Sequence, residues 1–407
     1  MSISFEEARR RILDAVRPLP PETIPLLDAV GRAIAEPLIA TRDMPRFDNS
    51  AMDGYAVRAE DCRPGTVLKV TGYIPAGGRA EPPLEPGCAV RIMTGAPLPP
   101  GADAVVPFEE TDEGSVRVLL RGQARTRDHI RFRGEDIAVG QLVMDAGTAL
   151  RPPEISLLAS FGQARVSVHG RPRVAILSTG DELVELGQPL SDETIVNSNS
   201  WSLAAAVKEI GAEPVMLGIA RDNLASLREK LSAGLACDAL ITSAGVSAGD
   251  RDLVREVLAE LGVEQLFWKI DIKPGRPTAF GMKGAVPVFS LPGNPVSSMI
   301  TFEEFARPAL LKMMGHRQVL KPLIKATLKQ PVRKRPGRTH FLRVTVYAEN
   351  GELVVASSGD QNTGILLTML RANAIAILPA EPGHLDAGDE VRIHLLDQVT
   401  DLDKDQR

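Results

Sequence analysis

The sequence has few cysteines and few aromatic residues. Its three cysteines, Cys62, Cys88 and Cys237, lie far apart in 407 residues, and none belongs to a Cys-x-x-Cys pair. This usage indicates neither a disulfide framework nor a zinc site, and it fits a reducing cytoplasm. Aromatic residues make up 4% of the chain, which leaves few platforms on which nucleic-acid bases could stack.

A large excess of charge of one sign is also missing. The 47 Lys and Arg residues nearly balance 52 Asp and Glu residues, for a net charge of −5. Bulk electrostatics therefore favour neither nucleic acid nor an anionic membrane. Charged residues at 6–11 interrupt the apolar core that a signal peptide needs, so secretion is not indicated. Three prolines interrupt the longest uncharged stretch, 284–302. We expect a cytoplasmic protein that binds no nucleic acid and no membrane.

Signatures of covalent hydrolases and of common nucleotide-binding loops are absent as well. No G-x-S-x-G motif accompanies the six histidines, which argues against a nucleophilic triad. The Gly-rich turn at 242–250, TSAGVSAGD, is not followed by GK[ST] and lacks the order G-x-G-x-x-G.

The chain length and its changing patterns predict an α/β multidomain protein. Residues 171–318 repeat a strand, a polar turn and a helix three times, which predicts a doubly wound parallel sheet with ligands at the carboxyl ends of its strands. Residues 43–137 contain short β-like runs between Gly and Pro turns, which predicts an inserted β-rich domain. Residues 319–407 contain short runs in which apolar and polar residues alternate, which predicts a β-barrel or sandwich. Residues 1–42 and 138–170 are expected to form a helical linker domain.

Three helices are expected in that linker domain. Ser4 can cap a helix that carries Phe5, Ala8 and Ile12, and prolines from Pro18 onward end it. Further helical patterns run over 26–37 and 152–162.

Two small-residue turns can bind an anion through backbone N–H groups. One is the turn at 242–250, before a helix starting near Asp252, and the other is LPGNPVSS at 291–298. In the second turn Ser297 or Ser298 can cap the next helix. Each pattern is equally typical of a tight structural turn, so both interpretations stay open.

Carboxylates and cations complete the candidate chemistry. Acidic residues at strand ends beside phosphate turns suit Mg²⁺, which prefers oxygen ligands, although a solvated or capping role explains each of them alone. Asp53 differs because its neighbourhood is uncharged and contains glycine. In FWKIDIKPGRP the cations Lys269, Lys273 and Arg276, followed by Arg343, suit a small oxyanion. Exposed strand-edge lysine is the alternative, above all for Lys269.

Several strings together resemble the molybdopterin molybdenumtransferases of the MoeA type, which are related to the E domain of gephyrin. The matching strings are DMPRFDNSAMDGYAV, RIMTGAPLPPGADAVVP, FRGEDI, AILSTGDEL, VNSNSW, TSAGVSAGDRD, FWKIDIKPGRP and LPGNPVSSM. The resemblance implies a MogA-like central domain, a C-terminal β-barrel, and transfer of molybdate to adenylylated molybdopterin, with Mg²⁺ as cofactor and release of AMP.

The resemblance also implies roles for individual residues. Those implied in catalysis are Asp53, Asp136, Glu182 and Asp222. Those implied in substrate binding are Thr94, Gly180, Asp181, Ser243, Gly245, Ser247, Asp250, Pro292, Gly293, Asn294 and Pro295. Lys269, Lys273, Arg276, Arg343 and Thr363 are implied in molybdate binding, and Glu182 and Asp252 in metal binding. Arg276 stands where the family pattern KPGKP has lysine.

Members of this family are homodimers, which implies a composite site holding Asp53 and Glu182 from different chains. The upstream adenylyltransferase and acceptor molybdoenzymes are further partners to consider. Two other functions stay open. Residues 171–315 alone resemble MogA-type adenylyltransferases, but the β-rich domain with Asp53 argues against that step. The second alternative function is that of a non-catalytic scaffold, and the intact acidic positions argue against it.

Overall fold

The structure is a computed structural model that describes residues 2–81, 83–245 and 253–396. The chain divides into two compact units. The larger unit contains residues 1–36, 146–156 and 164–407, and the smaller contains residues 37–145 and 157–163. Among the described residues, no helix combines the length and the apolar character that a membrane crossing needs.

The larger unit is built on a sheet of six strands in the order β15-β12-β16-β20-β19-β17. Their bounds are Glu213–Ala220, Arg173–Thr179, Ala239–Ser243, Val286–Leu291, Ala279–Lys283 and Glu264–Phe267. The first four strands are parallel, as the three repeats predicted, whereas β19 runs antiparallel to both of its neighbours, β20 and β17. The hairpin of β19 and β20 was not anticipated from the sequence. Gly284, at a φ of +58°, and Ala285 alone join β19 to β20, and so short a loop requires antiparallel strands.

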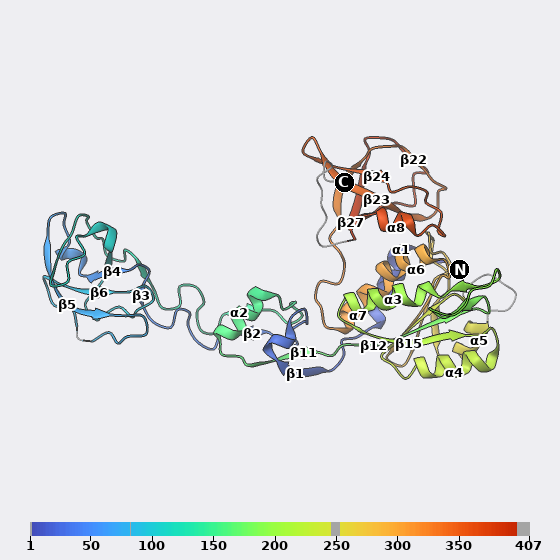
Figure 1. Ribbon diagram of the computed structural model, residues 1–407, viewed down its shortest axis with the longest axis horizontal. Coiled ribbons are helices and arrows are strands. Elements are labelled where there is room, and N and C mark those ends of the chain that lie inside the picture. The colour runs from blue at the N-terminus through green and yellow to red at the C-terminus, as the bar shows by residue number, and fades with distance from the viewer. Residues whose placement is uncertain (1, 82, 246–252, 397–407) are drawn as a thin grey trace. The chain divides into compact units, whose positions relative to one another are not determined.

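Helices cover both faces of this sheet, so the doubly wound arrangement is confirmed. In β12, Val174 and Ile176 pack in one core cluster, whereas Ala175 and Leu177 pack in another, because successive strand residues point to opposite faces. Figure 1 shows α4 and α5 on one side of the sheet and α3, α6 and α7 on the other. The helices are α3 (Ser198–Glu209), α4 (Leu224–Gly234), α5 (Leu253–Glu260), α6 (Pro295–Thr301), a π-helix (Phe302–Ala306) and α7 (Arg307–Met313).

The first helix, α1 (Phe5–Ala15), begins where the sequence predicts. Ser4 is its N-cap and accepts a hydrogen bond from the backbone N–H of Glu7. The ring of Phe5 packs edge-on against Phe305 and Phe341. The apolar face of α1 is therefore buried in the core that the helices of the sheet share.

The prediction of a helix over 26–37 is wrong. Only a 3-10 turn, Leu26–Ala29, forms there, and Gly31 follows with a φ of +78°, which ends any right-handed helix. The preceding strand β1 (Pro21–Pro25) pairs with β11 (Arg165–His169). The helix expected at 152–162 is confirmed as α2 (Pro152–Ser160).

The smaller unit contains the β-rich structure that its short runs predicted. Five strands pair in the order β7-β4-β6-β5-β8. Their bounds are Ala104–Pro107, Gly54–Val57, Cys88–Ile92, Val67–Ile74 and Arg117–Leu119. Two short pairs accompany them, β3 (Asn49–Ser50) with β9 (Ile130–Arg131) and β2 (Leu38–Ile39) with β10 (Leu142–Met144).

The C-terminal strands close into a five-stranded barrel, because β25 pairs with both β27 and β23. In ring order the strands are β23 (Thr339–Glu349), β24 (Glu352–Ser357), β21 (Ile324–Leu328), β27 (Glu390–Leu395) and β25 (Ala374–Leu378). The short strand β18 (Ile272–Lys273) adds to β23, and α8 (Leu367–Arg371) precedes β25. The barrel expected from the resemblance is therefore present.

Candidate active site

A pocket of about 450 Å³ lies at the carboxyl ends of three parallel strands. The ends of β12, β16 and β20 supply Ser178, Ser243 and the turn that begins at Pro292. The predicted residues that line it are Glu182, Ser243, Gly245, Pro292, Gly293, Asn294 and Pro295. Ligands of doubly wound sheets bind at this edge, so the structure brings together residues that the sequence placed in separate motifs.

Backbone freedom at Gly245 lets its turn pass close to α5. Gly245 has a φ of +73°, and a Cβ atom there would lie 2.3 Å from Cγ2 of Val254. The helix after the other turn begins differently from the prediction. Asn294 is its N-cap and Pro295 its first residue, so Ser297 and Ser298 lie inside α6 and cap nothing. Proline is well suited to that first position, where its missing N–H costs no hydrogen bond.

Asn199, which had no predicted role in the site, ties two of these strand ends together. Its Nδ2 donates to Oγ of Ser243, at 2.9 Å, and to the carbonyl of Gly293, at 2.7 Å. Its Oδ1 is buried without a hydrogen-bond partner among the described residues. An orphaned acceptor at the wall of a pocket is suited to a ligand N–H or O–H group. The string VNSNSW, one of those that carry the family resemblance, was the available signal.

Three carboxylates lie after β12 and β15. The backbone N–H of Asp222 donates to Oδ1 of Asp181 at 3.3 Å. Loss of hydration, and then the negative charges of Asp181 and Glu182, raise the pKa of Asp222 above its ordinary value. Gly180, at a φ of +144°, leaves space for the carboxylate of Glu182, which a Cβ atom at residue 180 would overlap. Such crowding of negative charge is favourable for a cation.

The predicted residues of the smaller unit fall in two places. Oδ1 of Asp53 accepts hydrogen bonds from the backbone N–H of Thr94, at 2.7 Å, and from its Oγ1, at 2.8 Å. These bonds lower the pKa of Asp53, so this exposed carboxylate is ionised at neutral pH. Asp136 lines another pocket of the same unit, together with Arg46 and Arg131.

The predicted cations differ in exposure. Lys273 and Arg276 are exposed, and Lys269 is half-buried. Lys273 pairs with His340 in the register of β18 and β23. Burial, and then the charge of Lys273 and of two further cations, lower the pKa of His340 to about 4. The imidazole is therefore neutral at pH 7, and the positive charge beside it resides on the Lys and Arg side chains.

Arg343 of β23 is buried, with 1% of its surface exposed. Its Nη2 donates to the carbonyls of Asp360, at 2.9 Å, and Asn362, at 3.2 Å. Burial lowers the pKa of its guanidinium. Arg343 thus holds the loop that carries Thr363, whose Oγ1 accepts a hydrogen bond from Nδ2 of Asn294 at 3.1 Å. In this way the barrel loop reaches the rim of the strand-end pocket.

Three predicted residues, Ser247, Asp250 and Asp252, lie outside the described residues. Within the described part, no group of three or more His, Cys, Asp or Glu side chains is placed to hold a metal ion.

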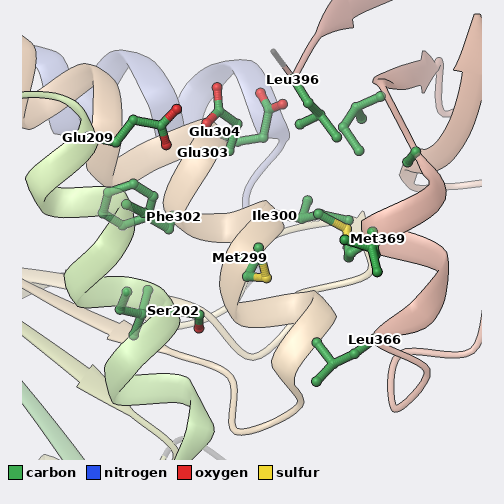
Figure 2. Close-up of a pocket in the computed structure, with 15 residues that line it drawn as sticks. Ser202, Glu209, Met299, Ile300, Phe302, Glu303, Glu304, Leu366, Met369 and Leu396 are labelled. Atoms are coloured by element: carbon green, nitrogen blue, oxygen red, sulfur yellow. The ribbon is translucent and has the colours of Figure 1, made fainter.

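An apolar cavity of about 480 Å³, lined by none of the predicted site residues, lies between α3, α6, the π-helix and the barrel. Figure 2 shows Glu209, Glu303 and Glu304 at one end of it and Leu366 at the other. Glu304 is 3% exposed, forms an ion pair with Arg9 of α1 and accepts a hydrogen bond from Nε2 of His394 at 2.6 Å. This buried network connects α1, the π-helix and β27, and no sequence motif pointed to it.

Comparison with known proteins accounts for nearly the whole chain. Three family models match in order: the MoeA N-terminal region (domain I and II) at residues 3–162, the probable molybdopterin binding domain at 175–312, and the MoeA C-terminal region (domain IV) at 325–396. A molybdopterin molybdenumtransferase of Haemophilus influenzae is 36% identical and covers 97% of this chain and 100% of its own. Molybdopterin molybdenumtransferase 2 of Mycobacterium tuberculosis is 38% identical, over 96% of this chain and 98% of its own.

A solved structure agrees with the fold. The molybdopterin biosynthesis MoeA protein of Pyrococcus horikoshii superposes with a TM-score of 0.83 at 32% identity, over 97% of this chain and 100% of its own. These matches span all the motifs, including the β-rich and barrel regions that a one-domain adenylyltransferase would lack. The chain therefore belongs to the molybdopterin molybdenumtransferases, the MoeA family of molybdenum cofactor biosynthesis.

Proposed function

We propose that this chain transfers molybdate to adenylylated molybdopterin, with Mg²⁺, and releases AMP and molybdenum cofactor. The strand-end pocket carries the proposal, because it joins small-residue turns, the carboxylate of Glu182 and the Oδ1 of Asn199, which no described residue partners, in one concave site. Backbone N–H groups in such turns suit phosphate, and a pocket of about 450 Å³ is of the size typical of small-molecule sites.

Each group has a task that follows from its surroundings. Asn199 is held by Ser243 and Gly293, so it presents Oδ1 to a donor group of the pterin. The exposed cations Lys273 and Arg276 attract molybdate by charge. Arg343 acts through the loop that it holds, which brings the Thr363 hydroxyl to Asn294. Positive charge near the phosphates stabilises the leaving AMP.

The residues present suit Mg²⁺ in chemistry. The pKa of Asp222 is raised by loss of hydration and by the neighbouring carboxylates that crowd it, and a bound cation relieves such repulsion. Mg²⁺ is commonly held by one or two carboxylates together with substrate phosphates, which fits a site whose described residues form no complete ligand set. When bound, the ion would neutralise phosphate charge. Glu182 and Asp222 would hold it here, with Asp252 as the further ligand implied by the resemblance.

We also propose that the enzyme works in the cytoplasm as a homodimer whose site combines Asp53 of one chain with Glu182 of the other. The upstream adenylyltransferase and acceptor molybdoenzymes are proposed as transient partners. Asp53→Ala and Glu182→Ala should each be inactive alone. After unfolding and refolding together, half of the dimers would be mixed and half of their sites intact, which restores about a quarter of wild-type activity. No restoration would contradict the shared site.

The reaction itself is tested with purified protein, adenylylated molybdopterin, molybdate and Mg²⁺, by following AMP release. We expect release to require molybdate. AMP formed equally without molybdate, or none formed at all, would contradict the proposed transfer.

A further inference from the structure

The smaller unit contains a pocket of about 600 Å³ that is rich in arginine. Arg42, Arg46 and Arg131 line it, together with the acidic residues Glu135 and Asp136. Two chain segments, 42–49 and 131–137, build its walls. Backbone pairing joins Asn49 to Arg131 and Met44 to Ile137, and the N–H of Gly134 donates to the carbonyl of Pro45 at 3.0 Å. The pocket is therefore a built feature of the fold and not the chance approach of long side chains.

The neighbouring carboxylates are largely engaged elsewhere. Asp43 accepts from the guanidinium of Arg133, at 2.5 Å, and from the N–H of Val139, at 2.8 Å. Asp48 accepts from the N–H of Arg133 at 2.8 Å. The carboxylate of Glu135 accepts from the N–H of Phe132 at 2.7 Å. These bonds fix the loop, and the lining of the pocket keeps an excess of positive charge, with three arginines against two carboxylates.

Two of the three guanidinium groups form no ion pair with the described residues of this unit. Arg42 donates to the carbonyl of Ser160. Within residues 37–81, 83–145 and 157–163, neither Arg46 nor Arg131 makes an ion pair or a side-chain hydrogen bond, and both are exposed to solvent. Like charges that share a concave site repel each other, and a bound anion relieves this repulsion. Guanidinium groups bind phosphate oxygens in bidentate fashion, which favours phosphate over a spherical anion.

We propose that Arg46 and Arg131 bind the phosphate of a phosphate monoester and that the carboxylate of Asp136, in the same pocket, accepts a hydroxyl of its sugar. The ligand class is a nucleoside monophosphate. The link to AMP as the released product rests on the proposed function, whereas the site rests on the pocket alone. Asp136, implied by the resemblance in catalysis, would then contact the nucleotide.

Protection of arginine from a dicarbonyl reagent tests the site on the full-length protein. Labelling of each arginine is measured by peptide mass spectrometry with AMP, inorganic phosphate, adenosine or no addition. We expect AMP to protect Arg46 and Arg131, and adenosine to protect neither. Protection by inorganic phosphate as well would assign the affinity to the phosphate group, and protection by AMP alone would assign part of it to the sugar and base. Both results support the site.

Substitution provides the matched control. Arg46→Gln and Arg131→Gln should each weaken AMP binding at this site about tenfold, and added salt should weaken it further. Arg117→Gln, which removes an exposed arginine of β8 in the same unit, should leave AMP binding unchanged.

Two outcomes would overturn the inference: equal labelling of Arg46 and Arg131 with and without AMP, or equal protection of Arg117. Molybdate-dependent AMP release without protection would overturn this site and leave the proposed function standing. Protection of Arg46 and Arg131 by AMP, without AMP release in the reaction, would support this site and contradict the proposed function.

Discussion

Asp53 accepts both hydrogen bonds of Thr94, from the backbone N–H and from the hydroxyl, through a single carboxylate oxygen. Oδ2 makes neither of these bonds, so the ionised carboxylate is oriented by one oxygen and can present the other. Asp53 follows β3 and Thr94 follows β6, so two separate loops of the smaller unit fix this geometry.

Thr94→Val should raise the pKa of Asp53, because the hydroxyl bond is lost while the backbone bond, the larger cause of the lowered pKa, stays. Carboxyl NMR titration measures the pKa of Asp53 in both proteins. The lowered pKa stabilises the folded state above the unfolded pKa, and this contribution disappears as pH falls through the folded pKa. Thr94→Ser, which keeps the hydroxyl, is the control. An unchanged pKa in Thr94→Val would show that the hydroxyl bond is unimportant.

Asp181→Asn should lower the pKa of Asp222, because it removes the larger of the two carboxylate charges that, after loss of hydration, raise it. A raised carboxyl pKa disfavours the ionised form in the folded state, so stability decreases as pH rises from the unfolded pKa through the folded one. The substitution should weaken that decrease. Titration of Asp222 in both proteins measures the shift. The control is Asp192→Asn, which removes an exposed carboxylate that is not among those causes and should leave the pKa of Asp222 unchanged. An unchanged pKa of Asp222 in Asp181→Asn would contradict the charge coupling.

Glu304→Gln should decrease the free energy of unfolding by about 3–5 kcal/mol, because it leaves Arg9 and His394 without their buried partner charge. The urea midpoint reports the loss. Glu390→Gln breaks the exposed pair with Lys325 in the same barrel and should cost about 0–1 kcal/mol. Similar midpoints for the two variants would mean that the buried network contributes no more than a surface pair.

Gly245→Ala should decrease the free energy of unfolding by about 2–5 kcal/mol, from a left-handed backbone and from overlap with Val254. Gly262→Ala is matched to it, since Gly262 also has a positive φ, of +82°, but a Cβ atom there meets open space. The control should cost about 1–2 kcal/mol. Thermal unfolding of both variants separates overlap from backbone strain, and equal losses would argue that Val254 moves aside.

Local patterns in the sequence predicted the strands and most helices well. The runs at Val174 and Val286 are apolar and end in small polar residues, which is the pattern of a buried parallel strand. The prediction of a helix at 26–37 is wrong because apolar spacing alone took no account of Gly31. Leu27, at the start of that segment, is 76% exposed.

Long-range relationships could not be predicted in the same way. Nothing near Arg343 in the sequence shows that its side chain is buried, or that the loop it holds brings Thr363 to Asn294. The bridging amide of Asn199 depends on the meeting of two strand ends, and the contact of Glu304 with Arg9 joins residues 295 positions apart. Motif matching placed residues in the pocket, but the contacts that orient them come from the tertiary fold.

The most direct test of the account measures AMP and molybdenum cofactor together in one reaction of the wild-type protein with adenylylated molybdopterin, Mg²⁺ and limiting molybdate. We expect one AMP for each molybdenum inserted, and loss of both products in Asn199→Ala, whose pocket wall lacks the bridging amide. AMP released without molybdenum insertion, or undiminished products in that variant, would contradict transfer at the strand-end pocket.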